Sequence, residues 1–152
     1  KTHLKYYDSD TVSCISNLAH LNTNEKNSIK FDKSKENFNK QPPIDRLLQF
    51  VRAEKPYFRS EIVPSDLKEV YCVKPKMNSR RILAQSGAFM IFGLTGALDD
   101  NDVSGIYTEK ININGKKKQS INKELDHTAI NDSSMFPEID KAASYIRQQP
   151  MS

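Results

Sequence analysis

The stretch RRILAQSGAFMIFG, from Arg80 to Gly93, brings together features that the rest of the chain keeps apart. Two arginines and a glutamine lead into a turn of small residues, and an apolar run follows at once. The first part predicts a short helix over 80–84 that stops at Ser86 and Gly87. The apolar run over 88–94 predicts a core strand that is buried on both faces. This stretch therefore indicates that helix and strand are combined in one fold.

Segments on both sides of this stretch predict further helices and strands. Capping residues and helical spacing predict helices over 10–20, 46–54 and 117–129 and a closing helix that begins at Pro137. The β-prone run over 70–73 and the alternation over 106–113 predict strands, and the acidic residues within 95–105 indicate a loop tip. The expected fold class is therefore α+β, with a small mixed or antiparallel sheet flanked by helices.

The length and composition favour one domain over residues 1–152 that carries a polar insertion. The chain has 152 residues, and its hydrophobic fraction of 37% is low for a globular protein. Residues 22–41 are rich in Asn, Lys and Ser, which predicts a mobile insertion. Its isolated apolar residues, Ile29, Phe31 and Phe38, offer the alternative that the segment is pinned to the body of the domain.

Charge and cysteine content set limits on partners and surroundings. The formal net charge is +4, from 23 basic and 19 acidic residues, which is compatible with a phosphate-rich ligand and does not decide the function. Cys14 and Cys72 lie in apolar surroundings, so we expect buried reduced thiols and a cytoplasmic location. No apolar run approaches the ~18 residues that span a bilayer, so no membrane partner is expected. Because the sequence begins with Lys1 and not with an initiator Met, we expect it to be part of a longer protein.

Familiar catalytic and metal-binding patterns are not found in the sequence. The carboxylates over 99–102 are consecutive, unlike the alternating ligands of a calcium loop, and the three histidines are scattered, so no metal site is predicted. Ser86 lacks the preceding glycine of a nucleophile elbow. The glycines form neither a dinucleotide fingerprint nor a phosphate loop.

Arg81 and Gln85 remain as the candidate site residues. The planar guanidinium of Arg81 suits a phosphate or a carboxylate, and the amide of Gln85 offers both a donor and an acceptor. Their place before a glycine turn and a core strand would hold them on rigid structure, which favours a site. A structural role is the alternative: Arg81 pairs with a local acid, Gln85 satisfies a strand end, and Gly87 only permits the turn.

Two stretches of the chain resemble the carboxy-terminal part of the FRG domain. They are RILAQSGAF over 81–89 and FPEID over 136–140, the latter followed by a closing helix over 141–146. The segment over 8–15 also resembles the middle portion of some members of this family, which occurs widely in bacteria and phages. The Phe-Arg-Gly motif that names the family is absent from this chain and should lie upstream of Lys1. The resemblance therefore implies that an amino-terminal segment of the same protein completes the domain.

The resemblance also implies a nucleotide-dependent function. FRG-like domains look similar to ADP-ribosyltransferase-like domains that bind NAD, in which an arginine holds phosphate and a late acidic or amide residue orients the nicotinamide ribose. Gln85 would then be the catalytic residue, Arg81 the phosphate or substrate contact, and Phe89 strand core beside the pocket. The expected function is an NAD-dependent transferase-like domain in a defence or toxin context. The alternative is a non-catalytic regulatory module that binds nucleic acid or a phage protein through its basic face and the 22–41 segment.

Overall fold

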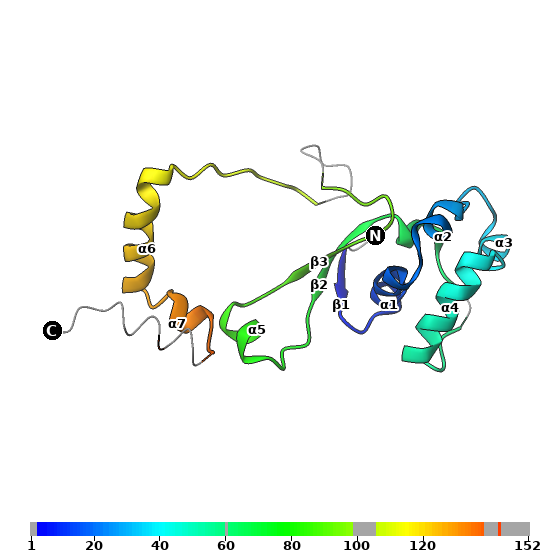
Figure 1. The fold of residues 1–152 in the computed structure, drawn as a ribbon, viewed down its shortest axis with the longest axis horizontal. Helices are drawn as coiled ribbons and strands as arrows, with labels where there is room; N and C mark the ends of the chain where they lie inside the picture. Colours follow the sequence, from blue (N-terminus) through cyan, green and yellow to red (C-terminus); the bar gives the residue numbers. More distant parts are fainter. Residues whose placement is uncertain (1–2, 60, 99–105, 139–142, 144–152) are drawn as a thin grey trace. The chain divides into compact units, whose positions relative to one another are not determined.

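The computed structural model describes residues 3–59, 61–98, 106–138 and 143 (Figure 1). The chain divides into two compact units. The first comprises residues 1–74 and 88–108, and the second comprises residues 75–87 and 109–152. The first unit contains the sheet and the main hydrophobic core, and the second contains both candidate site residues.

The sheet of the first unit has three strands in the order β1-β2-β3, which are β1 (Leu4–Tyr6), β2 (Val70–Lys74) and β3 (Phe89–Phe92). β1 runs parallel to β2, with Leu4 opposite Cys72. β3 runs antiparallel to β2, with Val73 opposite Phe89. The sheet is therefore mixed, and the predicted α+β class is confirmed. The sequence pattern predicted β2 and β3 but missed β1, which has only three residues.

Helices fill the long connection between β1 and β2. They are α1 (Asp10–Asn17), a 3-10 turn over Leu18–His20, α2 (Thr23–Ser28), α3 (Lys35–Asn39), α4 (Pro42–Glu54) and a second 3-10 turn over Pro64–Leu67. α1 begins as predicted, because the Ser9 hydroxyl caps it by accepting a hydrogen bond from the Val12 backbone N–H. α4 begins earlier than predicted, because both prolines fit the first turn of a helix, where the backbone N–H has no helical partner.

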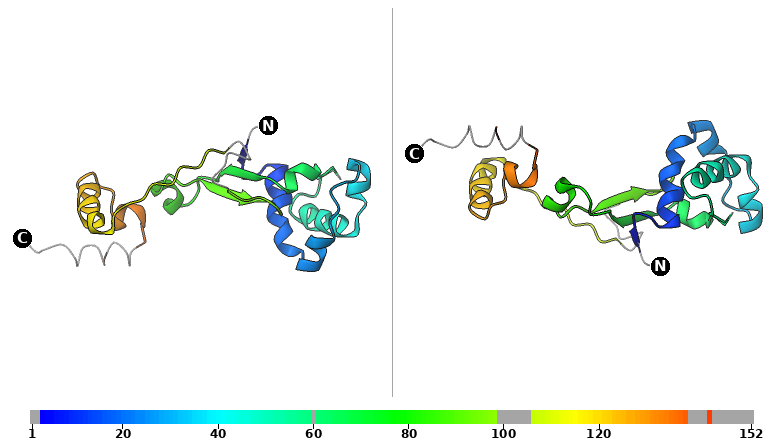
Figure 2. Two further views of the ribbon diagram at one scale, coloured as in Figure 1. Left: turned by 90° about the horizontal axis from the view of Figure 1, so that it is seen from above. Right: turned by 90° about the horizontal axis from the view of Figure 1, so that it is seen from below.

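The core lies between α1, α4 and one face of the sheet. α1 packs against the sheet on one side and against α4 on the other, so that α1 lies between the sheet and α4 in Figures 1 and 2. The buried residues of the core are Cys14, Ile15, Leu18, Leu21, Ile29, Phe38, Ile44, Leu47, Leu48, Val51, Ile62, Leu67 and Tyr71. Since Ile29 and Phe38 belong to this core and Phe31 packs against it, the polar segment over 22–41 is pinned to the first unit by its three apolar residues.

Two strand predictions were wrong in different ways. β3 is not buried on both faces: Phe89, Met90 and Phe92 are 53%, 38% and 47% exposed, and β3 is an edge strand with a described neighbour on one side only. Residues 106–114 form no strand. Ile111 and Ile113 are exposed, since no described strand pairs with this segment. The predicted loop tip falls largely at 99–105, outside the described residues.

The second unit contains short helices. They are α5 (Arg80–Ala84), a 3-10 turn over Gly115–Lys117, α6 (Lys118–His127) and α7 (Asp132–Met135). α5 and α6 match the helices predicted over 80–84 and 117–129. Most of the predicted closing helix lies outside the described residues. Of its first two positions and Ala143, which are described, Ala143 is helical and Pro137 is not.

Candidate functional site

Arg81 and Gln85 lie one turn apart on α5. Arg81 is in the helix and Gln85 is its C-cap, and the Gln85 backbone N–H donates to the Arg81 carbonyl at 3.0 Å. Side chains four residues apart on a helix project from the same face. Both side chains therefore reach the same neighbour, the segment over 135–138 at the end of α7.

Each of the two side chains makes a specific contact with that segment. The Gln85 amide Nε2 donates to the backbone carbonyl of Met135 at 3.0 Å. The Arg81 Nη1 lies 3.9 Å from the Glu138 carboxylate, and its guanidinium stacks over the Phe136 ring at 5.1 Å from the centroid. The start and end of α5 thus contact the segment over 135–138 within the second unit.

These contacts use only part of the hydrogen-bonding capacity of the two residues. No described residue donates to the Gln85 side-chain oxygen, and the Arg81 side chain is 56% exposed. An exposed ion pair as long as 3.9 Å contributes little to stability, about 0–1 kcal/mol. Both contacts are structural, but they differ from the local acid and the strand end that the sequence offered as the alternative: Arg81 faces the distant Glu138, and Gln85 bonds to the end of α7. They leave an amide oxygen and most of a guanidinium for a ligand.

The turn after α5 depends on Ser86 rather than on Gly87. Ser86 has a φ of 47°, in the left-handed region that non-glycine residues rarely adopt. A Cβ added to Gly87 would lie 3.8 Å from its nearest neighbour, the Ile82 carbonyl oxygen, which is an ordinary contact. The residue with the unusual turn conformation is therefore Ser86, directly after Gln85, and not Gly87 as expected.

A groove in the first unit was not foreseen from the sequence. It has a volume of about 770 Å³, with the buried side chains of Cys14, Ile62 and Leu67 among its lining. Polar side chains from the start of α1 and from the segments after α4 also line it: Asp10, Thr11, Lys55, Arg59, Glu61 and Asp66. These residues are distant in the sequence and share no motif, so only the fold brings them together.

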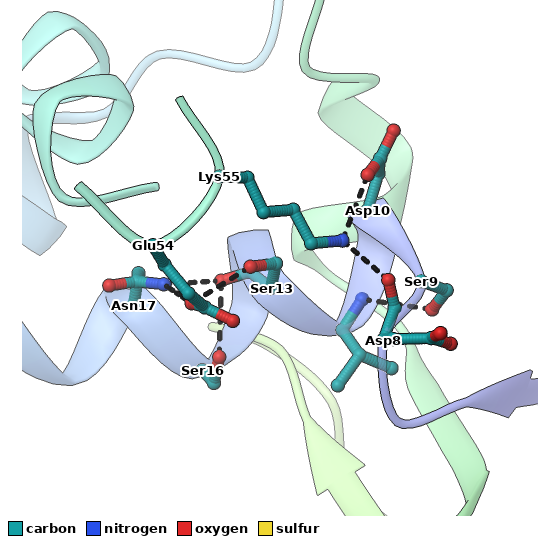
Figure 3. Close-up of polar contacts among 9 residues, drawn as sticks. Asp8, Ser9, Asp10, Ser13, Ser16, Asn17, Glu54 and Lys55 are labelled. Carbon is teal, nitrogen blue, oxygen red and sulfur yellow. Dashed lines mark hydrogen bonds and ion pairs between the residues drawn. The ribbon is translucent and has the colours of Figure 1, made fainter. Parts of the chain in front are cut away.

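The polar residues beside this groove bind one another (Figure 3). Lys55 Nζ donates to the Asp8 backbone carbonyl and to Asp10 Oδ1, the latter at 3.0 Å. The buried side chains of Ser13 and Asn17 both donate to Glu54 Oε2 at 2.9 Å. This network fastens the end of α4 to α1, and it pairs two of the polar residues that line the groove, Asp10 and Lys55, with each other.

Cys14, His3 and His20 each have a structural environment. Burial, assisted by the nearby Asp10 carboxylate, raises the pKa of the Cys14 thiol to about 12, so the thiol stays protonated near neutral pH and is a poor nucleophile. His3 stacks on Tyr71, whereas His20 lies against Phe50. Within the described ranges, no three His, Cys, Asp or Glu residues form a group that could hold a metal ion.

Comparison of the chain with models of protein families, with curated proteins and with solved structures finds no match. Among the helices that the structure describes, none is long and apolar enough to cross a membrane.

Proposed function

We propose that this chain is the later part of an FRG-like domain with an NAD-dependent, ADP-ribosyltransferase-like function in a defence or toxin context in the cytoplasm. The observation that carries the proposal is the arrangement on α5. Arg81 and Gln85 project from one face of this helix, and the second FRG-like stretch braces both. Side chains held in this way can orient a ligand, because their positions are fixed before it binds.

The chemistry of each side chain suits a different part of NAD. The forked donors of Arg81 match the oxygens of a phosphate. The Gln85 amide oxygen can accept a hydrogen bond from a ribose hydroxyl while its nitrogen holds the Met135 carbonyl. Because an amide does not titrate near neutral pH, Gln85 orients the ribose and moves no proton. An upstream segment of the same protein supplies the rest of the site.

Calorimetric titration of the complete gene product with NAD tests this proposal. Gln85→Ala should weaken NAD binding at least about tenfold, the equivalent of one lost hydrogen bond of ~1.4 kcal/mol. Gln119→Ala is the matched control, because Gln119 is an exposed glutamine of the same unit, and it should leave the affinity unchanged.

Loss of NAD binding has to be distinguished from loss of folding. Gln85→Ala also removes the bond to the Met135 carbonyl, so thermal unfolding must show that the variant is folded. Arg81→Lys keeps the charge and removes the forked donors, and we expect weaker NAD binding with little loss of stability. A folded complete protein that binds no NAD would contradict the proposal.

A second candidate function, a regulatory module that binds nucleic acid or an acidic phage protein, is favoured by the start of α6. Lys116, Lys117 and Lys118 are exposed there, and the first turn contains no acidic residue. The amino end of a helix favours anions, so three lysines at this place weaken the helix and suit an anionic partner. A steep fall of nucleic-acid affinity with salt, reduced by replacing the three lysines with alanine, would support this function. A flat salt response would exclude a phosphate partner.

A further inference from the structure

The groove of the first unit has the size of a small-molecule site. Residues from the start of α1 and from the chain after α4 line it, and all of them belong to the first unit. Its volume of about 770 Å³ lies within the range of roughly 300–1,000 Å³ that is usual for such sites. What the groove could bind therefore depends on the chemistry of its lining.

The buried part of the lining is apolar and uncharged. Cys14, Ile62 and Leu67 are buried, and the half-buried Phe58 packs against the same core. Burial, assisted by the nearby Asp10 carboxylate, raises the pKa of the Cys14 thiol to about 12, so this thiol is neutral near pH 7. We call these four side chains the floor of the groove. The floor suits an apolar part of a ligand, because a polar group placed there would lose its hydrogen bonds to water.

A tight turn after α4 places an exposed aromatic ring at the groove. The Phe58 backbone N–H donates to the Lys55 carbonyl at 2.9 Å, and Pro56 takes the second position of this turn, which proline favours. Phe58 packs against the core, whereas Tyr57 lines the groove and is 98% exposed. Burial does not account for the Tyr57 ring, whose face can stack on a planar group.

One charged side chain of the groove has no partner. The three carboxylates of the lining are each paired, Asp10 with Lys55 (Figure 3), Glu61 with Lys35 and Asp66 with the Thr11 hydroxyl. Arg59 also lines the groove, and within the described ranges its guanidinium has neither a hydrogen bond nor an ion pair. A guanidinium is a forked donor that suits the oxygens of a carboxylate or a phosphate. The charge that the groove leaves for a ligand is therefore positive.

We propose that this groove binds a small molecule that combines a flat apolar body with one anionic group, a carboxylate or a phosphate. The apolar body contacts the floor and the Tyr57 ring, and the anionic group pairs with Arg59. The candidate residues Arg81 and Gln85 belong to the second unit, so this inference is independent of the proposed function.

Three probes with the same apolar body and different end groups test the inference. Phenylpropanoate is an anion, phenylpropanol is neutral and phenylpropylamine is a cation. Titrations of the complete protein, followed by saturation-transfer NMR of the probe, measure their affinities. The anion should bind at least about threefold more tightly than the alcohol, a modest factor because Arg59 is exposed, and the amine should bind most weakly.

Two substitutions locate the bound probe. Arg59→Gln should remove the preference for the anion over the alcohol, because an amide carries no charge. Tyr57→Ala should weaken all three probes at least about twofold, since it removes a stacking surface and changes no charge. Both side chains are exposed, so neither substitution should affect folding. Arg80→Gln is the matched control: Arg80 is an exposed arginine of the second unit, and its replacement should leave the affinities unchanged.

Each of the other outcomes would overturn the inference. If no probe bound saturably, the groove would not be a small-molecule site of this kind. If the amine bound most tightly, the carboxylates and not Arg59 would set the charge that a ligand meets. A preference for the anion that survives Arg59→Gln and disappears in Arg81→Gln would place the probe on α5. NAD binding is a separate measurement, and its absence would reject the proposed function without affecting this result.

Discussion

Gly93 shows how one residue connects the sheet to the segment beside it. It follows β3, and its N–H donates to the Glu69 carbonyl at 2.9 Å. A Cβ at this position would clash with the Leu67 carbonyl oxygen and lie 2.8 Å from the carbonyl carbon of Lys68. These neighbours are backbone atoms and cannot move aside as a flexible side chain can. Only glycine permits so close an approach.

We therefore predict that Gly93→Ala lowers the free energy of unfolding by about 1–3 kcal/mol or more, the usual cost of forcing extra volume into packed structure. Gly115→Ala is the control, because no atom lies within 4 Å of a Cβ added there. Chemical denaturation monitored by circular dichroism measures both variants. Equal stability of Gly93→Ala and the parent chain would contradict the close approach.

The sequence singles out Arg81 and Gln85 as candidate site residues but could not predict their contacts. Their chemical types and their spacing of one turn are visible in the sequence, and α5 forms where the pattern predicts it. Their partners, Met135, Phe136 and Glu138, lie about fifty residues further on, and no local pattern states which acid or carbonyl will meet them. Side-chain partners of this kind depend on the tertiary fold.

At the scale of elements, the α1–α4 packing depends on a polar contact as well as on apolar burial. Glu54 at the end of α4 accepts hydrogen bonds from the buried Ser13 and Asn17 side chains of α1. Asn17 also donates to the Ser13 backbone carbonyl at 2.9 Å, whereas among the residues that the structure describes the Ser13 hydroxyl donates to Glu54 alone. Loss of the acceptor would leave a buried donor unsatisfied.

Glu54→Ala should accordingly destabilise the protein by about 1–3 kcal/mol, the cost of an unsatisfied buried polar group. Glu36→Ala is the comparison. Glu36 makes an exposed pair with Lys40 at 2.8 Å, and hydrogen bonding to this lysine lowers the pKa of the Glu36 carboxyl. We expect no measurable stability change for Glu36→Ala. If the two variants unfolded at the same denaturant concentration, the stabilising role of the Glu54 hydrogen bonds between α1 and α4 would be refuted.

The sequence predicted α1, α4, α5 and α6 but missed α2, α3 and α7, and it predicted strand pairing and burial poorly, for a physical reason. Helix boundaries depend on local signals, and the Ser9 cap and the stop after α5 lie where those signals place them. A strand depends on its neighbours. The apolar run over 88–94 does form β3, but its burial depends on a covering layer, and the alternation over 106–113 has no partner strand in the described chain.

On the scale of the whole molecule, the chain divides into two compact units. The first unit contains the core and the sheet, and the second contains Arg81 and Gln85. The burial of the strand residues could not be predicted, because the period of two in a strand shows which residues share a side and not which side is covered.

We propose above all that this chain contributes Gln85 and Arg81 to a nucleotide site that the complete protein forms. Calorimetric titration of the complete gene product with NAD tests it most directly, with Gln85→Ala and Gln119→Ala measured alongside. We predict saturable binding that is weakened at least about tenfold in folded Gln85→Ala and unchanged in Gln119→Ala. Absence of binding by the folded protein, or equal affinity in all three, would contradict the claim.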